Sequence, residues 1–168
     1  MSDMRQLYQE VILDHNRKPR NFGAVPDANR HAEGHNPVCG DHLKLTMKVL
    51  SDKIETIAFE GESCAICKAS ASMMTDAVKG KPVQEAEALV DEFRDMATGT
   101  LDPDKGNHHL GKLKIFAGVK DLPSRVKCAI LPWHTLHAAL LSSGAEPELS
   151  ASTEGVADPV PGTMIGEE

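Results

Sequence analysis

Three cysteines and one aspartate of this sequence have the chemical types that hold a metal ion: Cys39, Asp41, Cys64 and Cys128. Three thiolates and a carboxylate suit a four-coordinate zinc ion, and thiolates also suit iron in an iron–sulfur cluster. The carboxylate is a hard ligand among soft ones, and structural zinc sites are more often built from cysteine and histidine alone. This ligand set therefore favours a site in which one ligand is exchanged.

Residue types and spacing alone leave other interpretations open. Disulfides are rare in reducing compartments, so metal binding, thiol chemistry and simple burial remain for the cysteines. Cysteine is among the residue types most often buried, and scattered cysteines are commonly no more than small apolar side chains of a core. Spacing by itself does not decide between these roles.

A fourth cysteine, Cys67, follows Cys64 at the spacing of a thioredoxin redox pair, in the sequence Cys-Ala-Ile-Cys. A thioredoxin motif lies in a βαβ unit, whereas an antiparallel hairpin is predicted before this segment, so redox catalysis is disfavoured. We expect Cys67 to be a buried small residue on a helix, or a spare thiol able to replace Cys64 at the metal.

The elements that position these side chains follow from hydrophobic periodicity. Apolar residues at three-to-four spacing predict helices, and the alternation between residues 42 and 50 predicts a half-buried strand. The expected order is a helix at 3–15, strands at 42–50 and 54–59, helices at 64–79 and 83–97, a loop at 98–107, a short apolar segment at 110–118 and a helix at 123–141. The predicted fold class is α+β, with a small antiparallel sheet of about three strands packed on one face by helices.

The predicted hairpin brings two candidate segments together. It begins just after Cys39 and Asp41 and ends just before Cys64, so the chain returns to the same end of the sheet. Gly40 lets the loop turn tightly enough for Cys39 and Asp41 to face one point. Cys64 then opens a helix, where the dipole and the free amide donors lower the pKa of a thiol.

The remaining candidate, Cys128, lies near the start of the last predicted helix, four residues before Pro132. Proline has no amide hydrogen to donate to the Cys128 carbonyl. We therefore expect the helix to bend or restart near this cysteine.

Length, composition and charge narrow the class of protein. The 168 residues suffice for one domain with an apolar core, expected at residues 1–143. No apolar run approaches the roughly 20 residues that cross a bilayer, and the first residues lack a secretion pattern, so we expect a cytoplasmic protein without membrane partners. The formal charge of −7 argues against nucleic acid as a partner. Residues 144–168 are acidic and of low complexity, and are expected to be a disordered tail.

From residue 7 to residue 140 the sequence resembles the SufU proteins, members of the IscU/NifU N-terminal superfamily of iron–sulfur cluster assembly proteins. The matching stretches include Asn-Pro-Val-Cys-Gly-Asp at 36–41, and further matches lie at 7–15, 19–23, 61–64, 69–76, and 123–128 with Trp133. Lys127 precedes Cys128 where IscU proteins have a histidine, and residues 98–120 form an insertion that IscU proteins lack. Both features favour the SufU branch.

This resemblance implies the SufE/NifU (IscU-like) fold and a Zn²⁺ site on Cys39, Asp41, Cys64 and Cys128. It also implies a partner, a pyridoxal-phosphate-dependent cysteine desulfurase of the SufS type, whose persulfide sulfur passes to Cys39 and then to downstream cluster-assembly proteins. Cys39 would then be catalytic and the chain a sulfurtransferase. Arg125 and Lys127 are expected beside the ligands. Arg125 is a partner for thiolate or persulfide charge, or else an ordinary surface arginine.

Two alternatives use the same residues. The first is a non-enzymatic scaffold that assembles and transfers a [2Fe–2S] cluster on these four side chains, with iron in place of zinc. The second is an interaction module in which zinc only holds the fold together. The ligand types serve all three functions, so the sequence distinguishes them only through Lys127 and the insertion.

Overall fold

The computed structural model describes residues 2–37, 40–106, 108–141 and 149–152, and of residues 2–5 and 149–152 it describes the backbone alone. Its elements, in chain order, are α1 (Ser2–Arg17), β1 (Arg30–Asn36), β2 (Asp41–Leu50), β3 (Lys53–Glu62), α2 (Ala65–Val78), α3 (Val83–Ala97), the 3₁₀ segment η1 (Gly111–Asp121), α4 (Pro123–Leu141) and β4 (Leu149–Ser152).

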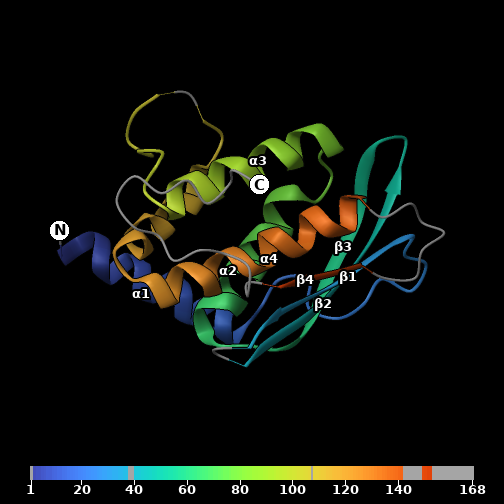
Figure 1. Ribbon diagram of the computed structural model, residues 1–168, viewed down its shortest axis with the longest axis horizontal. Helices are drawn as coiled ribbons and strands as arrows, with labels where there is room; N and C mark the ends of the chain where they lie inside the picture. Colours follow the sequence, from blue (N-terminus) through green and yellow to red (C-terminus); the bar gives the residue numbers. More distant parts are fainter. Residues whose placement is uncertain (1, 38–39, 107, 142–148, 153–168) are drawn as a thin grey trace.

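The strands form one sheet in the order β3-β2-β1-β4. Strands β1, β2 and β3 are antiparallel, and β4 adds to β1 in parallel. Helices α2 and α4 pack against the sheet, and α1, α3 and η1 pack on those helices (Figure 1). The predicted α+β class, an antiparallel sheet with helices, is confirmed.

The alternation predicted for the first hairpin strand is present in β2. Its core-facing residues are buried and its other face is exposed or half-buried, because successive side chains of a strand point to opposite faces. The buried set is Leu43, Leu45, Met47 and Val49. This apolar face is the surface on which the helices rest.

Helices α2 and α4 lie close together because the facing side of α2 is made of small residues. Ser70 is fully buried, donates its hydroxyl hydrogen to the carbonyl of Ala129 at 2.6 Å, and accepts the Trp133 indole N–H at 3.1 Å. The indole and the helix backbone are therefore both satisfied through one serine. This contact sets the distance between the helix that begins after Cys64 and the helix that carries Cys128.

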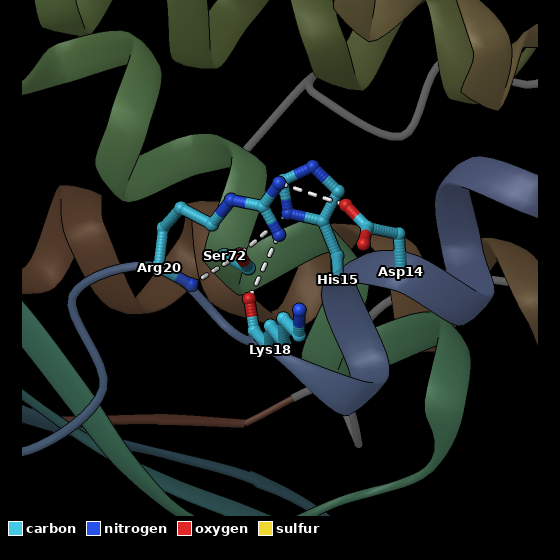
Figure 2. Close-up of polar contacts among 5 residues, drawn as sticks. All are labelled: Asp14, His15, Lys18, Arg20 and Ser72. Carbon is cyan, nitrogen blue, oxygen red and sulfur yellow. Dashed lines mark hydrogen bonds and ion pairs between the residues drawn. The ribbon is translucent and has the colours of Figure 1, made fainter.

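The C-terminal end of α1 is fastened to α2 through Ser72 (Figure 2). The Ser72 hydroxyl accepts the backbone N–H of Arg20 at 2.8 Å and shares a 2.6 Å hydrogen bond with Nδ1 of His15. Arg20 in turn pairs with Asp14 at 2.8 Å and donates to the carbonyl of Lys18. The sharp exit of the chain from α1 is thereby held against the helix bundle.

Strand β1 was not among the predicted elements, because its sequence Arg-His-Ala-Glu-Gly-His-Asn lacks large apolar residues. Its core-facing residues are Ala32, Gly34 and Asn36. The space above Gly34 is occupied by α4, since a Cβ at this position would collide with Thr135 Oγ1 and press on Leu131. The strand is small on its inner face because a helix lies directly on it.

Two further expectations for the C-terminal part have different outcomes. Helix α4 runs without a break from Pro123 to Leu141, so the restart predicted near Cys128 is wrong, and the bend expected there as the other possibility stays a prediction. Within the predicted tail, residues Leu149–Ser152 form the unexpected strand β4, and the other tail residues lie outside the described part of the chain. Among the described helices, none has the length and apolar character needed to cross a bilayer.

Replacing Gly34 with alanine should destabilise the fold by about 1–3 kcal/mol, because the added methyl group overpacks the contact between β1 and α4. Urea unfolding of the purified variant measures this change. Gly118→Ala is the matched control, since a Cβ there meets nothing within 4 Å and the glycine has no positive φ. Equal stability of the two variants would contradict the close approach of α4.

Candidate metal centre

Three of the four predicted ligands converge at one end of the sheet. Asp41 is the first residue of β2, Cys64 precedes α2 directly after β3, and Cys128 lies in the second turn of α4. One ligand atom from each residue lies within 4.8 Å of the other two. The hairpin β2–β3 therefore returns the chain to the start of β2, as predicted, and α4 supplies the third donor.

Cys39, the fourth predicted ligand, lies outside the described residues. It remains a candidate from the sequence, two residues before Asp41. Arg125 is exposed, and Lys127 is half-buried. Burial raises the pKa of Tyr8, while the positive charge of Arg125 lowers it and the charge of Cys64 raises it further. Arg125 and Cys64 therefore both lie within electrostatic range of this tyrosine.

Asp41 is fully buried, and its two carboxylate oxygens have different surroundings. Oδ1 accepts the backbone N–H of Cys64 at 2.8 Å. Oδ2 lies 3.9 Å from Cys64 Sγ and 3.5 Å from the side-chain nitrogen of Asn36. The first oxygen fixes the start of α2, and the second is the one that faces the thiols.

Cys64 is the N-cap of α2, and its sulfur accepts the backbone N–H of Cys67 at 3.4 Å. The pKa of Cys64 is lowered from its ordinary value of 9.0 to about 7, first by a hydrogen bond from Cys128 and then by the Cys67 and Ile66 amides. Burial and the Asp41 carboxylate act in the opposite direction. The helix N-terminus thus favours the thiolate, the form of cysteine that attacks electrophiles and binds metals.

Cys67 is fully buried and belongs to the hydrophobic core. In the described part of the chain the three-donor group consists of Asp41, Cys64 and Cys128, without Cys67. Of the two roles expected for Cys67, this placement favours the buried core residue.

Asn36 is a site residue that sequence analysis missed. It is the last residue of β1, pairs with Asp41 across the sheet and is fully buried. Its side-chain nitrogen lies 3.5 Å from Asp41 Oδ2 and 3.9 Å from Cys128 Sγ. Its position in the matched stretch 36–41 was the available signal, but with β1 unrecognised nothing indicated that this side chain points at the ligands.

The donor atoms fit a single small cation. In a tetrahedral site with zinc–sulfur distances of about 2.3 Å, neighbouring donor atoms lie about 3.5–3.8 Å apart. Cys64 Sγ and Asp41 Oδ2 are 3.9 Å apart, and all three donors lie within 4.8 Å of one another. Two sulfurs with one carboxylate oxygen suit zinc or iron and are a poor match for magnesium or calcium, which prefer oxygen.

A family model for the NifU-like N-terminal domain matches residues 7–140. The iron–sulfur cluster assembly scaffold protein IscU of Streptococcus pyogenes serotype M1 is 43% identical over 143 residues, which cover 85% of this chain and 88% of that protein. The zinc-dependent sulfurtransferase SufU of Bacillus subtilis strain 168 is 42% identical over 135 residues, which cover 80% of this chain and 90% of that protein.

A solved structure also resembles the fold. The crystal structure of a protein assigned to iron–sulfur cluster assembly in the SUF system of Fervidobacterium islandicum AW-1 superposes with a TM-score of 0.73. That protein is 37% identical, and the match covers 78% of this chain and 94% of its own.

Alkylation of Cys64 in metal-free protein should follow a thiol with a pKa of about 7, because only the thiolate reacts. The rate should therefore rise with pH and level off above that value. Short iodoacetamide pulses with fragment mass spectrometry locate the label. Cys128→Ala removes the main donor to the Cys64 sulfur, so its profile should move to higher pH. A wild-type profile centred near the ordinary value of 9.0 would contradict this arrangement.

Replacing Cys64 with serine should weaken zinc binding by more than about tenfold, since even outer partners of metal ligands contribute about 10- to 100-fold in affinity. Cys67→Ala should leave zinc affinity unchanged and cost about 1 kcal/mol of stability, because it removes a buried core atom. Competition with a chromophoric chelator measures both affinities. Loss of zinc in the Cys67 variant would instead support a ligand role for that thiol.

Proposed function

Because the chain belongs to the family of NifU-like N-terminal domains, we propose that it serves iron–sulfur cluster assembly as a zinc-dependent sulfur acceptor. The observation that carries the proposal is the convergence of the Asp41, Cys64 and Cys128 donors at one end of the sheet. Cys39 lies two residues before Asp41 in the sequence and is the proposed fourth ligand. The similarity to a relative named as a zinc-dependent sulfurtransferase supports this function.

The proposed reaction moves one sulfur atom from a cysteine desulfurase to Cys39. The thiolate of Cys39 attacks the outer sulfur of the desulfurase persulfide, a new sulfur–sulfur bond forms on Cys39, and the desulfurase cysteine leaves as a thiolate. A second thiol then takes the sulfur from Cys39 by the same exchange. A zinc ion held by Cys39, Asp41, Cys64 and Cys128 would keep the thiols deprotonated at neutral pH, and Cys39 would be the ligand that is released when it reacts.

The other residues keep the site in place during this exchange. Cys64 and Cys128 are the permanent sulfur ligands, because one begins α2 and the other lies inside α4. Asp41 is the weaker oxygen ligand and is oriented by the backbone amide of Cys64. Arg125, which is exposed, offers a positive charge to the anionic persulfide that the desulfurase presents.

The partners follow from this chemistry. The sulfur donor is a pyridoxal-phosphate-dependent cysteine desulfurase of the SufS type, and the acceptors are downstream cluster-assembly proteins. Both exchanges require reduced thiols, so we propose that the protein works in the cytoplasm. Nucleic acid and membranes have no part in the reaction.

A second candidate function is a scaffold on which a [2Fe–2S] cluster is built and then transferred. The relative from Streptococcus pyogenes, which is named as a scaffold protein, favours it. The same four side chains would ligate iron. Cluster assembly on this scaffold would not require a persulfide on Cys39. The two functions therefore differ in the metal that the purified protein carries.

Protein purified without oxygen should carry about one zinc ion per chain and should raise the turnover of its desulfurase with free cysteine. Cys39→Ala should bring that turnover back to the rate of the desulfurase alone, because the acceptor thiol is gone. Cys67→Ala is the matched control and should keep the stimulation. Metal analysis and sulfide release are the measurements.

Three outcomes separate the candidates. Strong visible absorption with iron and sulfide in place of zinc would transfer the assignment to the scaffold. Full stimulation by a folded Cys39→Ala variant would overturn sulfur transfer and leave zinc with a structural role. The proposal is supported if the protein carries zinc, Cys39→Ala no longer stimulates the desulfurase, and Cys67→Ala still does.

A further inference from the structure

We propose that Asn36 is a positioning residue of the metal centre, which acts on the metal through Asp41 and Cys128. This inference rests on the proposed zinc site and adds a residue that none of its ligand assignments includes. The carboxamide of Asn36 lies between two of the candidate ligand atoms. Its nitrogen is 3.5 Å from Asp41 Oδ2 and 3.9 Å from Cys128 Sγ. Both atoms can accept a hydrogen bond, so the side-chain N–H groups of Asn36 point at two of the atoms that would hold the metal.

The other half of the carboxamide indicates what holds it in this orientation. Asn36 Oδ1 is buried and has no hydrogen-bond partner among the described residues. A buried carbonyl oxygen without a donor is unfavourable, and such groups are rare in folded proteins. The orientation is therefore set by the contacts of the side-chain nitrogen with Asp41 and Cys128, and the oxygen has no partner among the described residues.

The fold places Asn36 at this point with little freedom. It closes the ladder between β1 and β2 opposite Asp41, and its side chain is completely covered. Two residues earlier, Gly34 lets α4 lie directly on β1, which brings the start of that helix and Cys128 toward the strand. Strand β1 thus contributes one polar side chain that bridges a ligand of the sheet and a ligand of a helix.

The physical effect of Asn36 is to orient two ligands. Both contacts are long for hydrogen bonds, so they contribute little to the stability of the metal-free fold. The two contacts nevertheless restrict the directions in which Asp41 Oδ2 and Cys128 Sγ can turn, so both atoms stay directed at the point where a cation would bind. Asn36 therefore raises metal affinity by preparing two ligands at once.

The test uses the full chain and zinc itself. Asn36→Leu keeps the shape of the side chain and removes its donors, and Asn36→Ala is a smaller second variant in case leucine is not accommodated. We expect zinc affinity, measured by chelator competition, to fall about 10- to 100-fold in both. The charge-transfer bands of bound Co²⁺ should shift as well, because the sulfur and oxygen donors are no longer held in the same geometry.

A matched control stands at the opposite end of the same strand. Asn29 precedes β1 and bonds the backbone of Val49 through both its oxygen and its nitrogen. Asn29→Ala should lower the urea midpoint and leave zinc affinity and the Co²⁺ spectrum unchanged. The Asn36 variants should show the reverse pattern, with the midpoint of the metal-free protein unchanged and affinity reduced.

Zinc affinity within about twofold of the unmodified protein in folded Asn36 variants would overturn this inference and leave the proposed function standing. Lower affinity only in proportion to lost stability would overturn it too, since that pattern belongs to a structural residue. Reduced affinity in a protein that binds zinc but transfers no sulfur would support the role of Asn36 and refute the proposed function. Failure of the unmodified protein to bind zinc or Co²⁺ would refute both.

Discussion

The constraint on which this structure depends is the crowding of three acidic groups in a buried place. Asp41 and Cys128 are almost entirely covered, and their donor atoms lie within 4.8 Å of the sulfur of Cys64. Ionised groups this close repel one another, and a buried ionised group needs hydrogen-bond donors around it. Hydrogen-bond donors surround these groups. They are the backbone amides of Cys64 and Cys67, the side-chain amide of Asn36, and the thiol of Cys128, which donates to Cys64. A bound cation would reduce the repulsion between the three groups further. The fold brings the three groups and their hydrogen-bond donors to one place.

Small residues let the helices and the sheet approach closely enough to bring Asp41, Cys64 and Cys128 together. Ser70 lets α2 and α4 approach each other while it satisfies the Trp133 indole and a helix carbonyl, and Gly34 lets α4 approach the sheet. The part of α4 that carries Cys128 is therefore positioned by α2 on one side and by β1 on the other. Larger side chains at either place would add apolar area to the core and would move a ligand away from its partners.

The parts of the fold that sequence could predict are those with strong periodicity. The helix expected at 83–97 is observed as Val83–Ala97, and the alternating strand at 42–50 is observed as Asp41–Leu50, because their apolar residues face one core. Strand β1 escaped prediction since its inner face consists of Ala32, Gly34 and Asn36, which carry no hydrophobic signal. The convergence of Asp41 and Cys64 followed from the hairpin. The approach of Cys128 and the direction of the Asn36 side chain depend on packing between distant segments, which no local pattern encodes.

The three donors belong to three different segments, separated along the chain by 23 and 64 residues (41 to 64, and 64 to 128). A cation bound by all three would link these segments in the folded protein. The unfolded chain does not hold the three side chains together and would bind the cation more weakly. Binding is then linked to folding, and a metal present at 1,000 times its dissociation constant adds about 4.1 kcal/mol to the free energy of unfolding. Metal supply would set how much folded protein persists against cellular proteases as well as how much of it is competent for chemistry.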